Sequence, residues 1–485
     1  MSIARALSNA VSGLTATARG TETVAANLAN VMTPGYGRRE VALSAQTLGG
    51  NGGGVRIDGA TRMVNATLVS EARLAASARS ESSVRADFLA RMTETIGLPG
   101  EEGALTTALT RFRSALQSAA ARPDDELRLT SVVDAAARLA ERLNQSSAAV
   151  QEARATADRA IASDVSALNA GLERVAYLNR RIAILESEGA DPSSLVDERQ
   201  AVIDGIGQIV PVQEVAREHG KVALFTTEGA VLLDGSQPTR LAFTAVGQMT
   251  PDLVAGTAPM MRLVQNGQEL TEGQMRLFSG GSLAANFAVR DELAPQVQQE
   301  LDALAFDLHE RLADPAADGT LGVADPGLFT DAGGLADAAS VNGLAQRLEV
   351  NAQVRPELGG DLWRIRSGIG AATAGPVGDS SLLLSLVDAL GAVGASQPGS
   401  GFDGNGSLQD RFGTVEARAS TRKVNAETDH AMRNSRAETI SARLMADGVD
   451  SDAEMQRLLQ YEQAYAANAR VIQAIEEMMD NILRL

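Results

Sequence analysis

The chain has 485 residues, of which 44% are apolar and only 3% aromatic, and its formal net charge at pH 7 is −18. An acidic surface disfavours binding to nucleic acid and to anionic membranes, and no apolar run reaches the ~18 to 20 residues of a membrane-spanning helix. The sequence contains no cysteine, which excludes disulfides, thiolate metal sites and cysteine nucleophiles. Because aromatic rings are so few, the core is expected to be built from small aliphatic side chains on closely packed helices.

The first helix is predicted from two sets of positions that each repeat every seven residues. One set is Ile3, Ala10, Thr17, Val24 and Val31, and the other is Leu7, Leu14, Thr21 and Leu28. A seven-residue repeat favours a coiled-coil seam over a broad apolar stripe.

A turn is expected directly after this helix. In the segment from Asn30 through Thr33 to Tyr36, Pro34 and Gly35 fit the second and third places of a type II turn. Residues 46–54 end in a glycine-rich run and are interpreted as a flexible connector. Residues 55–58 alternate in polarity like a short strand.

Helical spacing dominates the next part of the chain. One helix is predicted over 63–97, a second over the segment that contains Leu105 and Leu116, and a long rod over 129–185. As a single helix, the rod would be about 85 Å long, which indicates an elongated molecule. Asp191 is expected to cap the following helix, with Pro192 at its first position.

A different pattern begins near residue 210. Short β-branched runs separated by Glu-Gly and Asp-Gly pairs predict a small antiparallel β region over 210–279. Helical spacing returns over 293–312 and again over 408–444. Residues 314–406 are rich in Gly, Ala and Asp, which leaves two interpretations open: a loop-rich part of the helical body, or a reduced outer domain. Within them, 397–401 has the composition of a linker.

The last helix has a sharp predicted start, because Ser451 and Glu454 match the Ser-x-x-Glu capping box. It carries a second seven-residue repeat, formed by Leu458, Tyr461, Tyr465, Asn468, Ile472, Ile475, Met479 and Ile482. Asn468 would be a polar residue within this seam that fixes its register.

The two repeats predict that the ends of the chain pair with each other, since neither helix is expected to be stable alone in water. Two ordinary amphipathic helices packed on the body are the alternative. The predicted fold is mainly α and elongated, with a small antiparallel β region and a terminal coiled coil. Residues 1–54 and 446–485 would form an inner assembly domain, 55–209 and 280–445 a helical body, and 210–279 a β-rich region.

No catalytic, metal or cofactor site is expected. The three histidines, His219, His309 and His430, are far apart in sequence and fit solvated or hydrogen-bonded roles better than metal ligation. The glycine run at 49–54 lacks the Lys-Ser/Thr pair of a phosphate-binding loop.

Four segments resemble flagellar proteins. Residues 27–36, Asn-Leu-Ala-Asn-Val-Met-Thr-Pro-Gly-Tyr, resemble the N-terminal signature of flagellar rod, hook and hook-associated proteins, and residues 460–472 resemble their C-terminal signature. Residues 195–204, which contain Asp-Glu-Arg-Gln, and residues 281–305 resemble the hook-associated protein 1 family specifically. Residues 314–406 match this family least.

The resemblance implies a structural subunit that joins hook to filament and lies outside the cell, without enzymatic activity. Its implied partners are other copies of itself, the hook protein, the second hook-associated protein and an export chaperone at the C-terminal helix. It also implies export by the flagellar type III apparatus without a cleaved signal peptide. A hook or rod subunit is the nearest alternative, and a secreted enzyme domain is a more distant one.

Overall fold

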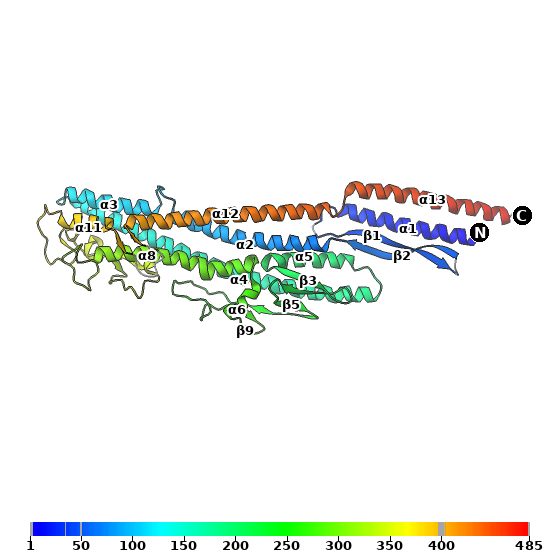
Figure 1. Ribbon diagram of the computed structural model, residues 1–485, viewed down its shortest axis with the longest axis horizontal. Helices are drawn as coiled ribbons and strands as arrows, with labels where there is room; N and C mark the ends of the chain where they lie inside the picture. The colour runs from blue at the N-terminus through cyan, green and yellow to red at the C-terminus, as the bar shows by residue number, and fades with distance from the viewer. Residues whose placement is uncertain (1–2, 34, 49–50, 396–401, 403, 484–485) are drawn as a thin grey trace.

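The computed structural model describes residues 3–33, 35–48, 51–395, 402 and 404–483. It confirms an elongated, mainly helical fold with small antiparallel sheets (Figure 1). The helices are α1 (Ile3–Ala29), α2 (Ala66–Ile96), α3 (Leu105–Ala121), α4 (Glu126–Ser187), α5 (Ser193–Ile209), α6 (Glu272–Met275), α7 (Gly281–Ala288), α8 (Ala294–Ala313), α9 (Leu344–Arg347), α10 (Arg364–Ser367), α11 (Ser381–Gly391), α12 (Leu408–Ala446) and α13 (Ser451–Leu483). Short 3₁₀ helices lie at η1 (Arg276–Phe278), η3 (Ala352–Val354) and η4 (Pro356–Leu358), and a π-helix lies at η2 (Val289–Leu293).

Every sheet among the described residues is antiparallel and small. The strands are β1 (Arg38–Leu48), β2 (Asn51–Met63), β3 (Val212–Ala216), β4 (Val222–Thr226), β5 (Val231–Asp234), β6 (Gln237–Pro238), β7 (Leu241–Ala242), β8 (Val264–Gln265), β9 (Gln268–Glu269), β10 (Phe329–Asp331), β11 (Leu348–Val350), β12 (Gly394–Ala395) and β13 (Asn405–Gly406). They pair as β1-β2, β3-β4-β5-β6, β7-β8-β9, β10-β11 and β12-β13. The predicted β region over 210–279 is therefore confirmed, with Gly229 and Gly235 at positive φ in its tight turns.

Helix α4 confirms the predicted rod, with 62 residues capped by the Asp125 carboxylate. At 1.5 Å per residue it is about 93 Å long. Its first half, to Ala157, packs with α3, α8, α11 and α12 in one hydrophobic core. From Ile161 onward it packs with α5, α7 and the β region in a second core. One helix thus joins both cores of the body.

The flexible connector predicted for residues 46–54 is wrong where the structure describes it. Strand β1 extends to Leu48 and β2 begins at Asn51, so this segment is part of a long hairpin with Val55 paired to Ala45. The glycine-rich strand is held from one side by α1, because the backbone N–H of Val55 donates to Ser12 Oγ at 3.2 Å. Residues 49–50 lie outside the described residues.

Two helix starts also differ from prediction. Helix α5 begins at Ser193 and not at Pro192, although the Asp191 carboxylate still accepts a hydrogen bond from the Ser193 N–H at 2.9 Å. At α13 the capping box is wrong: the Asp450 carboxylate accepts from the N–H groups of Asp452 and Ala453 at 2.9 and 3.2 Å. The Glu454 carboxylate does not cap the helix and instead binds Asn27 and Arg38.

Apolar side chains from residues 314–406 enter the first core. Leu328, Leu344, Ile365 and Leu386 are all at most 2% exposed and share this core with α3, α4, α8 and α12. That arrangement favours a loop-rich part of the body over a separate outer domain. The predicted linker at 397–401 lies outside the described residues.

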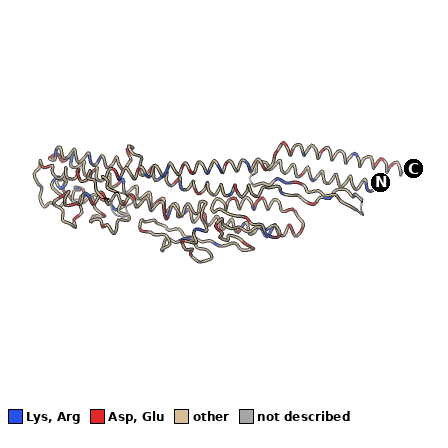
Figure 2. Tube along the Cα trace, viewed as in Figure 1, with Lys and Arg blue, Asp and Glu red and all other residues tan. Residues whose placement is uncertain are grey.

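The terminal helices and the β1-β2 hairpin project together from one end of the body (Figure 1). Neither α1 nor α13 contributes a side chain to the two main cores. No helix among the described residues is both long and apolar enough to cross a membrane. Acidic and basic residues are interspersed along the drawn trace, and neither kind is confined to one end of it (Figure 2).

Candidate assembly site

Helix α1 packs along α13 in the antiparallel direction, with contacts repeated every seven residues on both helices. Asn27 contacts Glu454, Gly20 faces the Tyr461 ring, and Gly13 faces the Asn468 amide. A Cβ at Gly20 would lie 2.5 Å from the Tyr461 ring, and one at Gly13 would lie 2.8 Å from Asn468. The helices approach this closely because both positions lack a side chain.

The predicted seam residues fall into two groups. Those that are buried or half-buried are Ile3, Leu14, Val24, Leu28, Leu458, Tyr461, Asn468, Ile472 and Ile475. Leu7, Tyr465, Met479 and Ile482 are 37 to 57% exposed, so this chain alone does not bury them. The role of either group in assembly stays a prediction, as does a true coiled coil.

Sequence reasoning missed the second set of contacts on α1. On α13, Asn468 faces Gly13, Tyr461 faces Gly20 and Glu454 faces Asn27. Each of these three α1 residues comes one residue before a position of the predicted repeat: Leu14, Thr21 or Leu28. The available signal is that two glycines, Gly13 and Gly20, and then Asn27 recur at the same seven-residue spacing. It was hidden because leucine is the stronger apolar marker.

Asn27 is fully buried and uses the whole hydrogen-bonding capacity of its amide. Its Oδ1 accepts from the Tyr36 hydroxyl and from the Arg39 N–H, both at 2.9 Å. Its Nδ2 donates to the Arg39 carbonyl at 2.8 Å and to Glu454 Oε2 at 3.0 Å. One side chain thus joins α1, the following turn, the hairpin and α13.

The predicted turn has the expected geometry at its described residues. The Tyr36 N–H donates to the Thr33 carbonyl at 3.2 Å, and Gly35 has a φ of +80°. Pro34 lies outside the described residues. The Asn30 carbonyl accepts from the Thr33 N–H at 2.9 Å, which closes a preceding turn over 30–33. Burial raises the pKa of Tyr36, which keeps its hydroxyl protonated and able to donate to Asn27.

Glu454 is 1% exposed and lies at the centre of the contacts that α13 makes with the hairpin. Arg38 Nε donates to its Oε1 at 2.9 Å and Arg457 Nη1 at 3.0 Å, while Asn27 binds its Oε2. A buried carboxylate requires such donors, because an unpaired one would be strongly destabilised.

Asp197 anchors the same hairpin to the body. Its carboxylate accepts from the Gly37 N–H at 3.1 Å, from Arg39 Nη2 at 3.0 Å and from Arg62 Nε at 2.7 Å. We call Asn27, Tyr36, Arg38, Arg39, Arg62, Asp197 and Glu454 the junction network. It links two of the family-like segments, 27–36 and 195–204, to the hairpin and to the start of α13.

The other members of segment 195–204 bind the body. Arg199 is 4% exposed and donates to Asn179 Oδ1 on α4 at 2.9 Å and to the Gly220 carbonyl at 2.7 Å. Burial lowers the pKa of Arg199. Asp204 accepts from Arg73 Nε of α2 at 2.6 Å. The segment therefore has a structural role in joining α5 to its neighbours.

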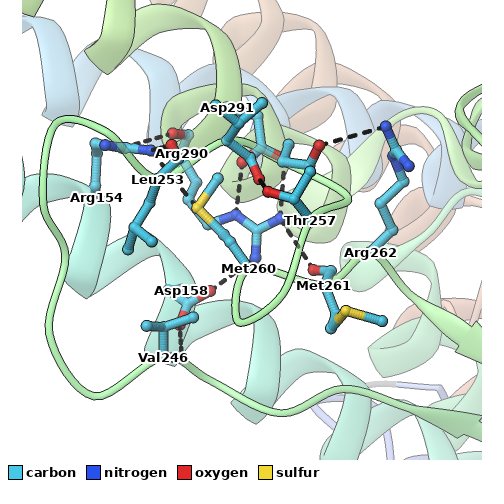
Figure 3. Close-up of polar contacts among 12 residues, drawn as sticks. Arg154, Asp158, Val246, Leu253, Thr257, Met260, Met261, Arg262, Arg290 and Asp291 are labelled. Carbon is cyan, nitrogen blue, oxygen red and sulfur yellow. Dashed lines mark hydrogen bonds and ion pairs between the residues drawn. The ribbon is translucent and has the colours of Figure 1, made fainter. Parts of the chain in front are cut away.

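The other family-like segment, 281–305, contains a buried charge cluster (Figure 3). Arg290 and Asp158 are both fully buried and form an ion pair at 2.7 Å, and Arg290 also binds Asp291 at 2.7 Å. Arg154 donates to the carbonyls of Arg290, Thr250 and Leu253 at 3.1, 2.9 and 2.9 Å. The cluster lies on α4 between its two cores and fixes the loop that contains residues 246–262.

The histidines lie apart. His309 is buried on α8, His430 on α12 contacts Ser82, and His219 lies in a loop at φ 56°. Within the described part of the chain, no group of three His, Asp or Glu side chains is placed to hold a metal ion.

Comparison with known proteins agrees with this geometry. Residues 89–325 match the model of the flagellar hook-associated protein FlgK helical domain. Residues 7–36 match that of the flagella basal body rod protein, and residues 441–485 that of the flagellar basal body rod FlgEFG protein C-terminal region. The three matches follow each other along the chain and cover α5, α13 and most of α1, which the junction network joins, but not the β1-β2 hairpin.

Two curated relatives are both described as flagellar hook-associated protein 1. The one from Bacillus subtilis is 23% identical over 95% of this chain and 94% of its own length. The one from Salmonella typhimurium is 22% identical over 62% of this chain, which spans only 54% of that relative. The solved flagellar hook junction protein FlgK from Burkholderia pseudomallei is 22% identical, with 54% of this chain and 46% of that one covered at a TM-score of 0.46. This chain belongs to the flagellar hook-associated protein 1 family.

Proposed function

We propose that this protein is a structural subunit of the bacterial flagellum that joins the hook to the filament. The junction network carries the proposal, because it ties the paired ends of the chain to the body through Asn27, Asp197 and Glu454, one from each region that matches a flagellar family model. Such a network sets the orientation of a projecting end, which a subunit of a tubular assembly requires. The family is structural, and we propose no turnover.

The exposed face of α13 supports an assembly role. Large apolar side chains that are 45 to 81% exposed recur along it: Met455, Leu459, Tyr465, Val471, Met478, Met479, Ile482 and Leu483. Only Glu454 and Ile475 of this helix are buried in the single chain. An apolar face this long is expected to be covered by another protein chain.

The partners follow from the family. We propose that α13 and α1 contact further copies of this chain, the hook protein and the second hook-associated protein, and that an export chaperone covers α13 before export by the type III apparatus. The assembled protein would lie outside the cell, at the hook–filament junction.

A strain that lacks this gene tests the proposal. It should build hooks of normal length, carry no filaments and release filament subunits into the medium, and the wild-type gene should restore filaments. Normal filaments in the deletion strain would contradict the proposal. Loss of the hooks themselves would favour the alternative of a hook or rod subunit.

A further inference from the structure

A cavity of about 310 Å³ lies where the terminal helices leave the body. It is enclosed by α2, by the end of α12 and by the turn that contains Thr33 and Tyr36, and we call it the root groove. Its apolar lining includes Val64, Val69, Leu444, Met445 and Val449. Met445 is 72% exposed, so the groove opens to the surface with an apolar rim.

The charges around the root groove leave arginines without partners. Arg38, Arg62 and Arg73 in its wall are paired with Glu454, Asp197 and Asp204. Arg79 also lines it and has no ion pair among the described residues. Arg436 and Arg443, on the adjoining surface of α12, are exposed and likewise unpaired within that part of the chain. Asp447 in the lining and Glu71 on the adjoining surface are also exposed and unpaired there, so the unpaired arginines outnumber the unpaired carboxylates by three to two. The groove therefore favours an occupant that is both apolar and acidic.

The tip of α13, residues 476–483, has this chemistry. Met478, Met479, Ile482 and Leu483 are 48 to 81% exposed. Glu476, Glu477 and Asp480 are exposed beside them and have no ion pair among the described residues. The sequence from Glu476 onward has three acidic residues and one basic residue, Arg484, so its net charge is opposite to that of the unpaired arginines at the groove.

The tip cannot reach the groove of its own chain. Val449 lines the groove and Met479 lies 30 residues further along, which is about 45 Å of straight helix. Figure 1 shows the C-terminus at the far end of α13 from the break between α12 and α13. We infer that the root groove receives the α13 tip of a second copy of this chain.

Such a contact joins different surfaces of the two copies, head to tail. Contacts of this kind build rings or open helical stacks and not closed two-fold dimers. This inference deepens the proposed function, because it assigns one of the contacts through which the subunit assembles with itself. The deletion strain tests the joining of hook and filament without reference to this contact, so either idea can fail alone.

Cross-linking of two purified full-length variants tests the inference. Because the chain has no cysteine, Met445→Cys and Met479→Cys each introduce a single thiol at an exposed position. Mixed at high concentration with a short bis-maleimide, the two differently tagged proteins should form heterodimers. The control pairs Met479→Cys with Leu358→Cys, an equally accessible position on η4 at the other end of the body. A yield no higher than that of this control would overturn the inference.

Charge reversal gives a second readout. Glu477→Lys on the tip, or Arg443→Glu beside the groove, should each lower the heterodimer yield about fivefold, as expected for the loss of an exposed ion pair. Combining Glu477→Lys on one partner with Arg443→Glu on the other should restore it, whereas Glu462→Lys, on α13 but outside the tip, should change nothing. Yields that are insensitive to both reversals would overturn the charge pairing between tip and groove on which the inference rests.

Discussion

Asn27 and Glu454 are 427 residues apart in the sequence, yet the Asn27 amide donates to the Glu454 carboxylate at 3.0 Å. Both side chains are almost completely buried. Because Asn27 also binds the turn and Glu454 also binds Arg38 of the hairpin, this one contact closes the chain ends into a single unit. Changes at either residue should therefore act on the projecting end and not on the body.

Glu454→Ala should loosen that end. It leaves Arg38 Nε and one of the two Asn27 Nδ2 hydrogens without an acceptor, while the other still binds the Arg39 carbonyl. Such a loss at a buried site costs about 1 to 3 kcal/mol. Hydrogen exchange should become about tenfold faster or more in α1 and α13 and remain unchanged in α4. Glu462→Ala, at an exposed position on the same helix, is the matched control. Equal effects of the two changes would contradict the role assigned to Glu454.

Gly20→Leu should separate α1 from α13, since even a Cβ at this position would lie 2.5 Å from the Tyr461 ring. The second change Tyr461→Ala removes that ring and should restore part of the pairing. Ala25→Leu, at an exposed position on α1, serves as the control. The pairing can be followed by cross-linking between cysteines placed on the two helices. A failure of Tyr461→Ala to compensate would show that the two residues do not oppose each other.

The secondary structure of the body could be predicted because it follows from local patterns. The rod α4 has continuous 3–4 spacing without a proline, and Gly229 and Gly235 mark their turns directly. The hairpin at residues 51–54 could not be predicted, since its glycine-rich strand is held by pairing with β1 and by Ser12 of α1. Contacts with other elements of the fold cannot be predicted from the local sequence pattern alone.

The candidate site shows the same limit. Ser451 and Glu454 fit a local capping motif, but Asp450 supplies the cap and Glu454 binds residues of α1 and the hairpin. Seven-residue spacing identified which helices pair. It did not identify the glycines in contact, because a glycine has no side chain to mark an apolar face.

Arg290→Met should destabilise the body by about 3 to 5 kcal/mol, because it leaves Asp158 buried without its partner. Chemical denaturation of the purified protein measures this loss. Arg217→Met breaks the exposed pair with Asp234 and should leave the free energy of unfolding nearly unchanged, because solvent screens an exposed ion pair. If the two changes had similar effects, the cluster in Figure 3 would not connect the two cores as described.

Amide exchange in the free subunit should be faster in the terminal helices than in the rod. Helix α13 buries only two of its 33 residues, whereas α4 carries buried side chains into both cores. Helices with little buried apolar surface open at low free energy. Assembly should slow exchange in α1 and α13 specifically. Protection of α13 equal to that of α4 before assembly would show that the chain ends need no partner.

Protonation of His309 should make the body less stable in mild acid. Its Nδ1 lies 2.9 Å from the Phe329 carbonyl and its Nε2 lies 3.1 Å from the Ala336 N–H. A carbonyl only accepts and an N–H only donates, so the ring is neutral with its proton on Nδ1. Burial lowers the pKa of His309 below its ordinary value, although Asp331 and Glu310 act in the opposite direction.

Since the folded pKa of His309 lies below the unfolded one, this residue contributes its full stability above the unfolded value of ~6.5 and loses it as the pH falls toward the folded value. Asp302, whose pKa is raised to about 6 by burial, has the opposite pH dependence, so each variant must be compared with the wild type at both pH values.

His309→Gln can keep both hydrogen bonds without titrating. The loss of unfolding free energy between about pH 7.5 and about pH 5.5, on either side of the ordinary histidine pKa, should therefore be smaller in His309→Gln than in the wild type. An identical pH dependence in His309→Gln and in the wild type would show that His309 does not titrate in this range.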